Sequence, residues 1–322
     1  MPPVTLELQP LFTAVRQAAE LCRRVQDAHL VSSDKEGQEP VTIADYGSQA
    51  IISRALRRAY PDDGILAEES GEQFVNLVPE DRRKTVVALL SDILGEAVRQ
   101  TDVVAWLDHG QNRVTERLWV IDPIDGTKGF LALRSYVIAV GFMLNRQPVA
   151  SVIGAPAHPS PGGMLFHSQS GVAYQQPLSG GLLKRIHVSE RSEASGIRAL
   201  ESVEKSHTNH ERMARVRAAA GLGDAALTRI DSMEKYARIA AGEAELYLRL
   251  PRLNSTRPFM IWDHAAGTAL VQAAGGRVTD IDGSPLDFSE GRALRNKGIL
   301  VSNGRIHDRV IAAIGQVLTQ EE

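Results

Sequence analysis

A chain of 322 residues in which 43% are hydrophobic is long enough to bury a large core, as two packed domains or as one layered unit. The formal net charge of −3 excludes the broad basic surface that duplex nucleic acid requires, so a small ligand held by a few local cations is expected rather than a nucleic acid polymer. The single cysteine, Cys22, cannot form an internal disulfide; it lies in an apolar helical pattern, which predicts a packing residue in a cytoplasmic protein. No apolar run is long enough to span a membrane and the first ten residues do not resemble a secretion signal, so no membrane partner is expected.

The first half of the chain is predicted to contain helices followed by a strand meander. Apolar residues at helical spacing predict a helix over 8–29, and the residues after Pro40 lead into a second helix that ends at Pro61. The other predicted elements are a short buried strand over 65–67, a peripheral helix over 81–99, a loop over 108–112, and strands from Leu118 and over 136–144, 149–155 and 164–167.

The second half alternates strands with helices, which is typical of a layered α/β unit. Strands are predicted near 226–230, 246–250, 277–280 and 298–301, and helices near 210–220, 232–241, 263–274 and 305–318. A stretch rich in Pro and Gly over 175–181 is a candidate domain boundary. It divides the chain into an N-terminal domain over 1–176 and a C-terminal domain over 177–322.

The segment 119–129, WVIDPIDGTKG, is the most informative part of the sequence, because an apolar run ends there in two carboxylates. Pro123 fixes the backbone between Asp122 and Asp125, so a sharp turn can aim both side chains and the Ile124 carbonyl at one point. Oxygen ligands of that kind suit Mg²⁺. The segment therefore predicts a site for a hard cation.

Gly126 and Thr127, which follow directly, are typical of the start of a helix. Backbone N–H groups at such a start can bind a phosphate, and the Thr hydroxyl can cap the turn or hold a water. The simpler interpretation of the whole segment is a strand followed by an Asp-rich turn and an ordinary cap.

Acidic residues recur at three places where an apolar strand ends or a helix begins. These are Glu68-Glu69 after 65–67, Asp122 and Asp125 after 118–121, and Asp263 after 260–262. Crowded carboxylates repel one another and are costly unless cations neutralise them, so convergence of the three places would favour bound metal. Two simpler interpretations stay open: Asp263 as the N-cap of the Ala-rich helix that follows, and Glu69 as a solvated turn residue.

Two motifs, DPIDGT over 122–127 and WDHAAG over 262–267, resemble the signature pair of the lithium-sensitive, Mg²⁺-dependent phosphatase superfamily that includes the inositol monophosphatases. Further motifs resemble one branch, the 3′(2′),5′-bisphosphate nucleotidases: PVTIAD (40–45), AEES (67–70), GTKGFL (126–131), ESVEKSH (201–207), DSMEKY (231–236) and YLRLP (247–251). The resemblance spans most of the chain. It implies an α+β fold, a layered αβαβα sandwich whose N-terminal half contains a large antiparallel sheet and whose C-terminal α/β half contains a smaller mixed sheet.

The same resemblance implies two or three Mg²⁺ ions, inhibition by Li⁺, and in-line attack of water on a phosphomonoester. The implied metal ligands are Glu68, Asp122, the Ile124 carbonyl, Asp125 and Asp263. The implied catalytic residues are Asp45, Thr127 and Glu68, and the implied phosphate-binding residues are Gly126 and Thr127. The chemistry is consistent, because a metal lowers the pKa of bound water and a Thr hydroxyl can relay a proton to a carboxylate.

The substrate contacts implied by the resemblance are His207, Ser232, Lys235, Arg249 and Asp263. They supply cationic or hydrogen-bonding groups for a second phosphate and an adenosine ring. Taken singly, the first four can also be a loop residue, a helix cap, a solvated helix residue and a strand-edge charge, respectively.

The leading hypothesis is therefore a phosphatase that removes the 3′-phosphate from adenosine 3′,5′-bisphosphate to give AMP, and that also accepts the sulfated analogue. Its expected partner is a small phosphorylated nucleotide. One alternative is the same chemistry on an inositol phosphate or another sugar phosphate. Another is a non-catalytic protein that binds a nucleotide or a cation. The sequence does not decide between a monomer and a homodimer.

Overall fold

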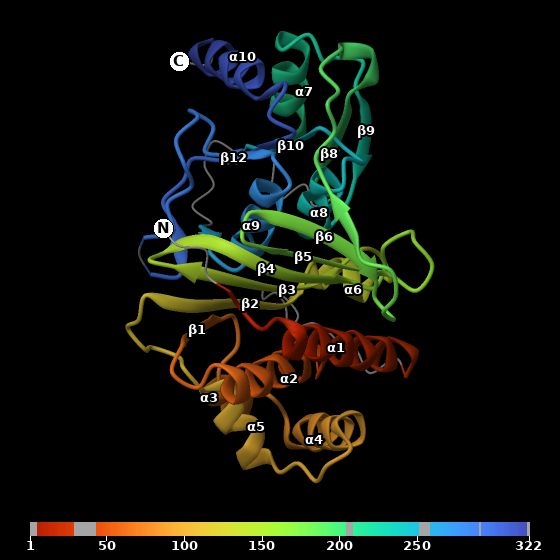
Figure 1. Ribbon diagram of the computed structural model, residues 1–322, viewed down its shortest axis with the longest axis vertical. Coiled ribbons are helices and arrows are strands. Elements are labelled where there is room, and N and C mark those ends of the chain that lie inside the picture. The colour runs from red at the N-terminus through yellow and green to blue at the C-terminus, as the bar shows by residue number, and fades with distance from the viewer. Residues whose placement is uncertain (1–4, 29–42, 204–208, 251–257, 290, 321–322) are drawn as a thin grey trace.

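The computed structural model describes residues 5–28, 43–203, 209–250, 258–289 and 291–320, which form stacked layers of helices and sheets (Figure 1). The helices are α1 (Gln9–Asp27), α2 (Ile43–Ala59), α3 (Gly71–Leu77), α4 (Glu80–Leu94), α5 (Gln100–Leu107), α6 (Thr127–Leu131), α7 (His210–Ala219), α8 (Glu234–Ala240), α9 (Ala265–Ala273) and α10 (His307–Thr319). The strands are β1 (Gly64–Ala67), β2 (Arg117–Asp125), β3 (Val137–Leu144), β4 (Gln147–Ala155), β5 (Met164–Gln169), β6 (Val172–Pro177), β7 (Lys184–Ile186), β8 (Arg198–Glu201), β9 (Ala226–Arg229), β10 (Leu246–Arg249), β11 (Phe259–Met260), β12 (Arg277–Thr279), β13 (Ala293–Leu294) and β14 (Ile299–Ser302).

The first sheet has seven strands in the order β1 to β7. β1 is parallel to β2, and the later strands pair antiparallel with their neighbours in the chain, so the predicted meander is confirmed. α1 and α2 cover one face of this sheet, and α9 packs on the other face (Figure 1). Gly141 in β3 permits this close approach, because a Cβ there would lie 3.0 Å from the backbone nitrogen of Ala266 in α9.

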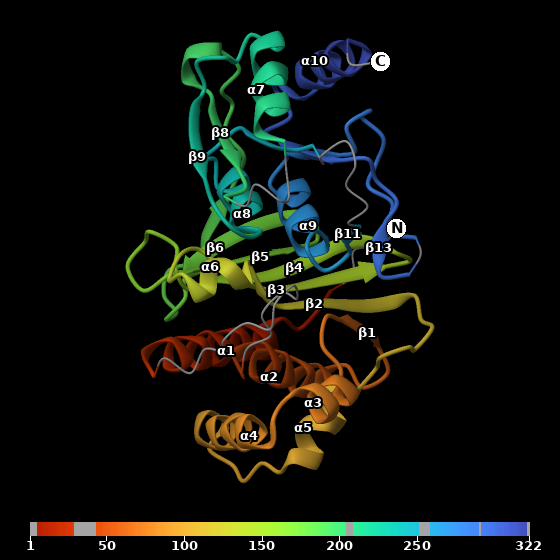
Figure 2. The ribbon, with the colours of Figure 1, turned by 180° about the vertical axis from the view of Figure 1, so that it is seen from behind.

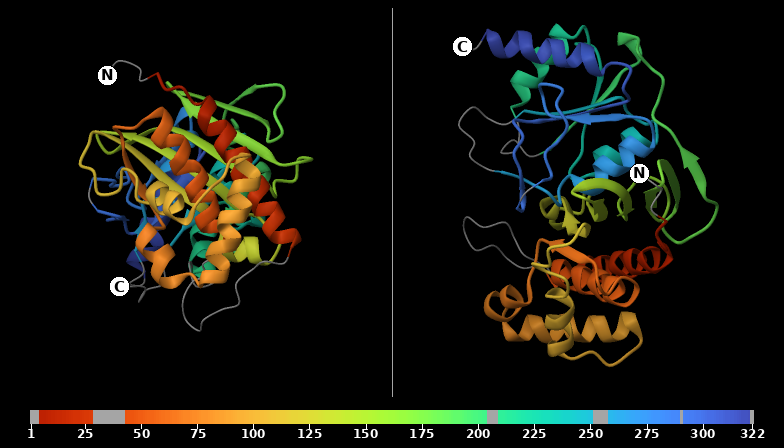
Figure 3. Two further views of the ribbon diagram at one scale, coloured as in Figure 1. Left: turned by 90° about the horizontal axis from the view of Figure 1, so that it is seen from below. Right: turned by 60° about the vertical axis from the view of Figure 1, so that its left-hand side comes forward.

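The second sheet is smaller and mixed, with the order β12-β14-β10-β8-β9. β10 is parallel to β8 and β8 is parallel to β9, whereas β14 runs antiparallel to both of its neighbours. α8 and α9 lie between the two sheets, and α7 and α10 lie beyond the second one (right panel of Figure 3). A separate short ribbon of β11 and β13 is visible from behind (Figure 2). The predicted αβαβα sandwich, with a large mainly antiparallel sheet and a smaller mixed one, is confirmed.

The peripheral helix predicted over 81–99 is found as α4 (Glu80–Leu94), and a second helix that was not predicted, α5 (Gln100–Leu107), follows it. α4 ends at Leu94 because Gly95 adopts a left-handed conformation, with φ of +64°, that terminates the helix. The chain becomes helical again in α5, whose residues Val103 and Leu107 are fully buried. Gly95 is visible in the sequence as a possible helix end, and the prediction extended the helix past it to residue 99.

The candidate domain boundary falls at the end of β6. β7, which follows it, still pairs with β6, so the first sheet continues past residue 177. The division into domains over 1–176 and 177–322 stays a prediction.

Cys22 is a packing residue, as predicted. It is fully buried in α1, and its sulfur lies 3.4 Å from the hydroxyl of Ser48 in α2. Burial raises the pKa of the thiol to about 12, so the reactive thiolate is suppressed. Among the helices in the described ranges, none combines the length and the apolar character needed to cross a bilayer.

Candidate active site

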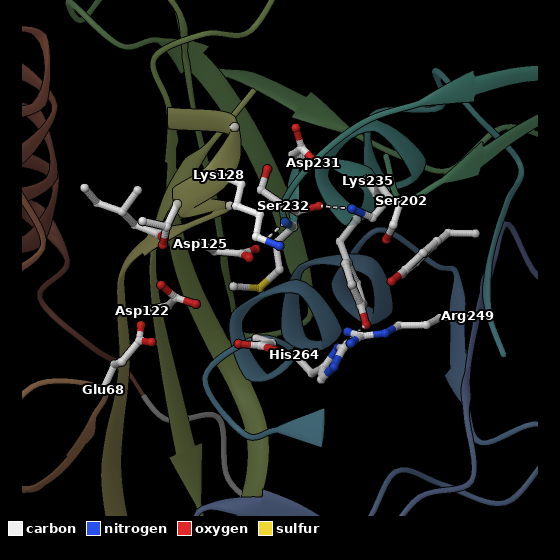
Figure 4. A pocket seen from close by; sticks show the side chains of 18 residues that line it. Glu68, Asp122, Asp125, Lys128, Ser202, Asp231, Ser232, Lys235, Arg249 and His264 are labelled. Atoms are coloured by element: carbon white, nitrogen blue, oxygen red, sulfur yellow. Dashed lines mark hydrogen bonds between the residues drawn. The ribbon is translucent and has the colours of Figure 1, made fainter. Parts of the chain in front are cut away.

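A cavity of about 100 Å³ lies where the end of β2 meets α6, the loop before α8, the end of β10 and the turn before α9. Its lining comes from both halves of the chain. Figure 4 shows the acidic side chains Glu68, Asp122 and Asp125 on one side, with Lys128 beside Asp125, and the cationic side chains Lys235 and Arg249 on the other side. Such a cavity is suited to a ligand with two anionic groups, one held directly by cationic side chains and one held through a metal on the acidic side.

β2 presents two carboxylates to this cavity because the strand is irregular between them. Its register with β3 shifts between Asp122 and Asp125, where Pro123 lacks an N–H for the sheet ladder. The Thr127 hydroxyl donates to the Ile124 carbonyl at 3.2 Å and closes the turn. The turn predicted from the motif is therefore built from a strand irregularity and a side-chain hydrogen bond.

Asp122 is the carboxylate whose pKa is affected by the largest number of acidic neighbours. Its side chain is 2% exposed, and burial raises its pKa well above the usual range; the charges of Glu68, Asp125, Asp263 and Asp45 raise it further. The acids predicted to converge thus meet in one region. Within the described ranges, no three His, Cys, Asp or Glu side chains are close enough to form a ready metal-binding group.

Two simpler interpretations of acidic residues are wrong. The N-cap of α9 is His264, whose side chain makes no capping hydrogen bond, and Asp263 lies one residue earlier and lines the cavity. Glu69 is not a solvated turn residue, because it is 5% exposed and burial raises its pKa. Its carboxylate bonds to Tyr46, and its backbone carbonyl accepts from the Gln49 amide at 2.7 Å. Glu69 therefore packs away from the cavity and fixes the end of β1.

The remaining residues predicted for catalysis and phosphate binding lie around the same region. Asp45 is 4% exposed in the first turn of α2, near enough to raise the pKa of Asp122. Gly126 and Thr127 both line the cavity, and Gly126 has a φ of +90°, which favours glycine. Because α6 has only five residues, its dipole is weak, and any phosphate contact there depends on individual N–H groups and the Thr hydroxyl.

The two cationic side chains are held in different ways. Lys235 is 4% exposed, so the interpretation as a solvated helix residue is wrong; its ammonium donates to the carbonyls of Ile230 at 2.9 Å and Ser232 at 2.6 Å. Burial lowers the pKa of Lys235 to about 8, although Asp125 opposes that shift. Arg249 ends β10, and its guanidinium lies 4.7 Å from the centre of the Phe259 ring.

Ser232 lines the cavity in a backbone conformation that is uncommon for a non-glycine residue, with φ of +68°. Its hydroxyl accepts from the N–H of Glu234 at 3.3 Å, so the cap-like contact considered from the sequence is present alongside the pocket position. His207 lies outside the described residues.

One contact that the sequence did not reveal joins the two halves at Glu68. The guanidinium of Arg292 donates to the carbonyl oxygens of Ala67 at 2.9 Å and Glu68 at 3.1 Å, and it lies 4.6 Å from the Trp262 ring centre. Arg292 thus connects the end of β1 to the residue before Asp263. No local pattern marks this arginine, because the two carbonyls that it bonds are more than 200 residues away.

A second contact joins the 126–135 region to the loop before α8. The Ser135 hydroxyl donates to the Asp231 carbonyl at 3.3 Å, and the Asp231 carboxylate pairs with Arg134 at 3.0 Å. The Met233 N–H donates to the Asp125 carboxylate. Asp125 is therefore oriented by the second half of the chain. Other cavity-lining residues that sequence reasoning left out are Lys128, Ser202, Tyr236, Tyr247 and His264.

A protein-family model described as the inositol monophosphatase family matches residues 7–319 of the chain. The chain belongs to the inositol monophosphatase family. This assignment confirms the resemblance carried by the two signature motifs. Members of the inositol monophosphatase family generally depend on Mg²⁺.

Among curated members of the inositol monophosphatase family, one similar protein is the 3′(2′),5′-bisphosphate nucleotidase 2 of Candida albicans, which is 33% identical over 98% of this chain and 98% of that protein. The 3′(2′),5′-bisphosphate nucleotidase of Schizosaccharomyces pombe is 32% identical over 98% and 96%, respectively. The probable 3′(2′),5′-bisphosphate nucleotidase 4 of Arabidopsis thaliana is 35% identical over 99% and 97%.

Two solved structures have the same fold as this chain. The Thermotoga maritima IMPase aligns with a TM-score of 0.66 at 21% identity, covering 97% of both chains. The extragenic suppressor protein suhB from Bartonella henselae aligns with a TM-score of 0.67 at 21% identity, covering 95% of this chain and 97% of that one. At this identity the comparison establishes the fold alone.

The donor atoms on the acidic side fit the cation that this family generally uses. Asp122 Oδ1 is buried and has no hydrogen-bond partner among the described residues, which is costly for a carboxylate oxygen unless a cation or donor meets it. The neighbouring donors are carboxylate oxygens and the Ile124 carbonyl, all of them hard ligands. The residues present therefore fit Mg²⁺ in chemistry, without defining the number of ions.

Proposed function

We propose that this protein is a Mg²⁺-dependent phosphomonoesterase that hydrolyses the 3′-phosphate of adenosine 3′,5′-bisphosphate to give AMP, and that it accepts the sulfated analogue. The observation that carries this proposal is the division of one cavity into an acidic side and a cationic side. A substrate with two phosphates can place the scissile one against the acidic side and the other against Lys235 and Arg249. The names of the curated relatives support the same substrate.

In this proposal Glu68, Asp122, the Ile124 carbonyl, Asp125 and Asp263 hold Mg²⁺, as two or three ions, and Li⁺ inhibits. Bound there, Mg²⁺ would supply charge stabilisation at the phosphoryl oxygens and a lowered pKa for water. The substrate contacts are His207, Ser232, Lys235, Arg249 and Asp263, and the phosphate contacts are Gly126 and Thr127.

Asp45, Thr127 and Glu68 prepare water for attack. The Thr127 hydroxyl donates its hydrogen to the Ile124 carbonyl, and its oxygen can accept a hydrogen bond from water. In the proposed step the hydroxyl turns from that carbonyl to a carboxylate, gives its proton to the carboxylate and takes one from the attacking water. As the water oxygen bonds to phosphorus, the ester P–O bond breaks and the departing 3′ oxygen takes a proton. No Ser, Cys or His nucleophile is required, because water itself attacks phosphorus. The fully buried Cys22 lies in α1 and is not part of the cavity lining.

A phosphate-release panel tests the function directly. We expect Mg²⁺-dependent release from adenosine 3′,5′-bisphosphate, slower release from inositol 1-phosphate, and suppression of both by Li⁺. The reason is that both substrates use the acidic side of the cavity, whereas only the bisphosphate also uses Lys235 and Arg249. Faster turnover of inositol 1-phosphate would favour the sugar-phosphate alternative, and no release from either would favour a binding protein.

Replacing the two cationic side chains, Arg249 and Lys235, should have different effects on substrate affinity and stability. Arg249→Met should raise KM for the bisphosphate by about 10- to 100-fold, and raise it more than KM for adenosine 3′-monophosphate, because a hydrogen bond to a charged group contributes about 1.5–3 kcal/mol. Lys235→Met should also lower the free energy of unfolding by about 2 kcal/mol, because it deprives two backbone carbonyls of their donor. Steady-state kinetics and urea unfolding of both variants measure these effects. Equal losses on the two substrates would contradict a second phosphate site.

A further inference from the structure

His264 lies in the wall of the candidate active site, and a single hydrogen bond fixes its ring. It is 1% exposed, lines the cavity, and its Nδ1 lies 2.7 Å from the Tyr236 hydroxyl. Tyr236 is itself held firmly, because Gly267 leaves room for its ring: a Cβ at that position would lie 2.5 Å from the Tyr236 Cγ. α8 and α9 thus pack so closely that the orientation of the imidazole is set by the fold.

This hydrogen bond determines which ring nitrogen carries a hydrogen. The imidazole is the one hydrogen-bond partner of the Tyr236 hydroxyl among the residues that the structure describes. If His264 Nδ1 were the donor, both the hydroxyl hydrogen and the lone pair on Nε2 would be buried without a partner, whereas donation by the hydroxyl leaves only the Nε2 hydrogen without one. Each buried polar group without a partner is unfavourable by about 1–3 kcal/mol. The hydroxyl therefore donates to Nδ1, and Nε2 carries the hydrogen.

Nε2 is consequently a buried donor that has no acceptor within the described part of the chain. Nε of Arg249 is in the same situation. Both side chains line the cavity, and Figure 4 shows them on the same side of it. Lys235, by contrast, already directs its ammonium at two carbonyls. The cavity wall therefore contains two buried N–H donors, His264 Nε2 and Arg249 Nε, that lack an acceptor among the described residues. Such a pair of donors is complementary to an oxygen-rich anion.

We propose that His264 donates its Nε2–H to the phosphate of the substrate that is not cleaved, together with Arg249, and that Tyr236 is the positioning residue that holds this hydrogen on Nε2. The inference rests on the proposed function and adds two residues to the substrate site. It assigns to His264 a role separate from that of the adjacent Asp263. The ligand class is a nucleotide with a phosphate besides the scissile one.

Glutamine and asparagine variants of His264 provide a matched test. The amide nitrogen of Gln reaches the position of Nε2, whereas that of Asn reaches only the position of Nδ1. We expect His264→Asn to raise KM for adenosine 3′,5′-bisphosphate about tenfold more than KM for adenosine 3′-monophosphate, and His264→Gln to restore most of the difference. Tyr236→Phe should give a selective loss of about threefold, because the hydrogen is no longer confined to Nε2. Equal effects of Asn and Gln, or equal losses on both substrates, would overturn the assignment.

Calorimetric binding of AMP, which retains the uncleaved phosphate, gives a readout besides turnover. His264→Asn should weaken AMP about tenfold relative to adenosine, with Gln again intermediate. An unchanged ratio of AMP to adenosine affinity would overturn the inference even if kinetics changed. If the wild-type protein releases no phosphate from the bisphosphate, the proposed function fails and the inference fails with it; a wild-type protein that is active, with variants that lose no selectivity, refutes only the inference.

Discussion

Asp122→Asn should lower Mg²⁺-dependent phosphate release about a thousandfold and, at the same time, raise the melting temperature of the metal-free protein. The loss follows because Asp122 is the acid whose pKa is raised by the charges of Glu68, Asp125, Asp263 and Asp45, which makes it central to the proposed metal site. A metal contributes several kcal/mol of transition-state stabilisation, at about 1.36 kcal/mol per tenfold in rate. The gain in stability follows because a neutral amide at the buried position 122 removes repulsion with the neighbouring carboxylates. Phosphate release at saturating Mg²⁺ and thermal unfolding with a chelator measure the two effects.

Two further measurements test the expected effects of Asp122→Asn. Mg²⁺ should raise the melting temperature of the wild-type protein by binding the folded state, and this increase should be smaller in Asp122→Asn. Asp224→Asn, which makes the same change at an exposed position, should alter neither property. Turnover at the wild-type rate in Asp122→Asn would contradict the ligand assignment, and a lower melting temperature would contradict the repulsion.

Gly129→Ala should destabilise the protein by about 3 kcal/mol and reduce turnover about 100-fold. A Cβ at this position would lie 2.1 Å from the backbone oxygen of Ser135, and backbone cannot move aside as a flexible side chain can. Either α6, with Gly126 and Thr127 at its start, or the backbone at Ser135 must shift, and displacements of about 1 Å at a catalytic site reduce rates by that order. Urea unfolding and steady-state kinetics measure the two losses.

The matched control is Gly315→Ala in α10, where no atom lies within 4 Å of the added Cβ. That exposed helical position should become more stable by roughly 0.5–1 kcal/mol, since alanine is the better helix former. Its turnover should equal that of the wild-type protein. If both glycine variants behaved alike, the close approach of Ser135 to α6 would not exist in solution.

The α9 helix shows what a local sequence pattern can predict and what it cannot. Its Ala-rich sequence predicted a helix over 263–274, and the helix is found at Ala265–Ala273. The same pattern could not separate an N-cap role for Asp263 from a place in the cavity, because both require only a carboxylate before a helix. That choice depends on how α9 packs against the first sheet, where Gly141 admits it closely.

The interpretations of Glu69 and Lys235 as solvated residues were wrong for a related reason. Both are charged residues that on composition alone belong at the surface. Glu69 is buried because Tyr46 and the amide of Gln49 lie on α2, and Lys235 because the loop before α8 presents two carbonyls to it. Burial of a charge is a property of its three-dimensional partners, which a window of neighbouring residues does not contain.

The sequence by itself determined the family, the order of the layers and the acids of the candidate site, because motifs such as 122–127 join chemistry and turn geometry within a few residues. Only the tertiary structure revealed the hydrogen bonds that join the two halves of the chain at that site. Arg292 holds Glu68 from more than 200 residues away, and the N–H of Met233 orients Asp125. Such contacts depend on the packing of both sheets around α8 and α9, so they leave no periodicity or spacing that a linear pattern could reveal.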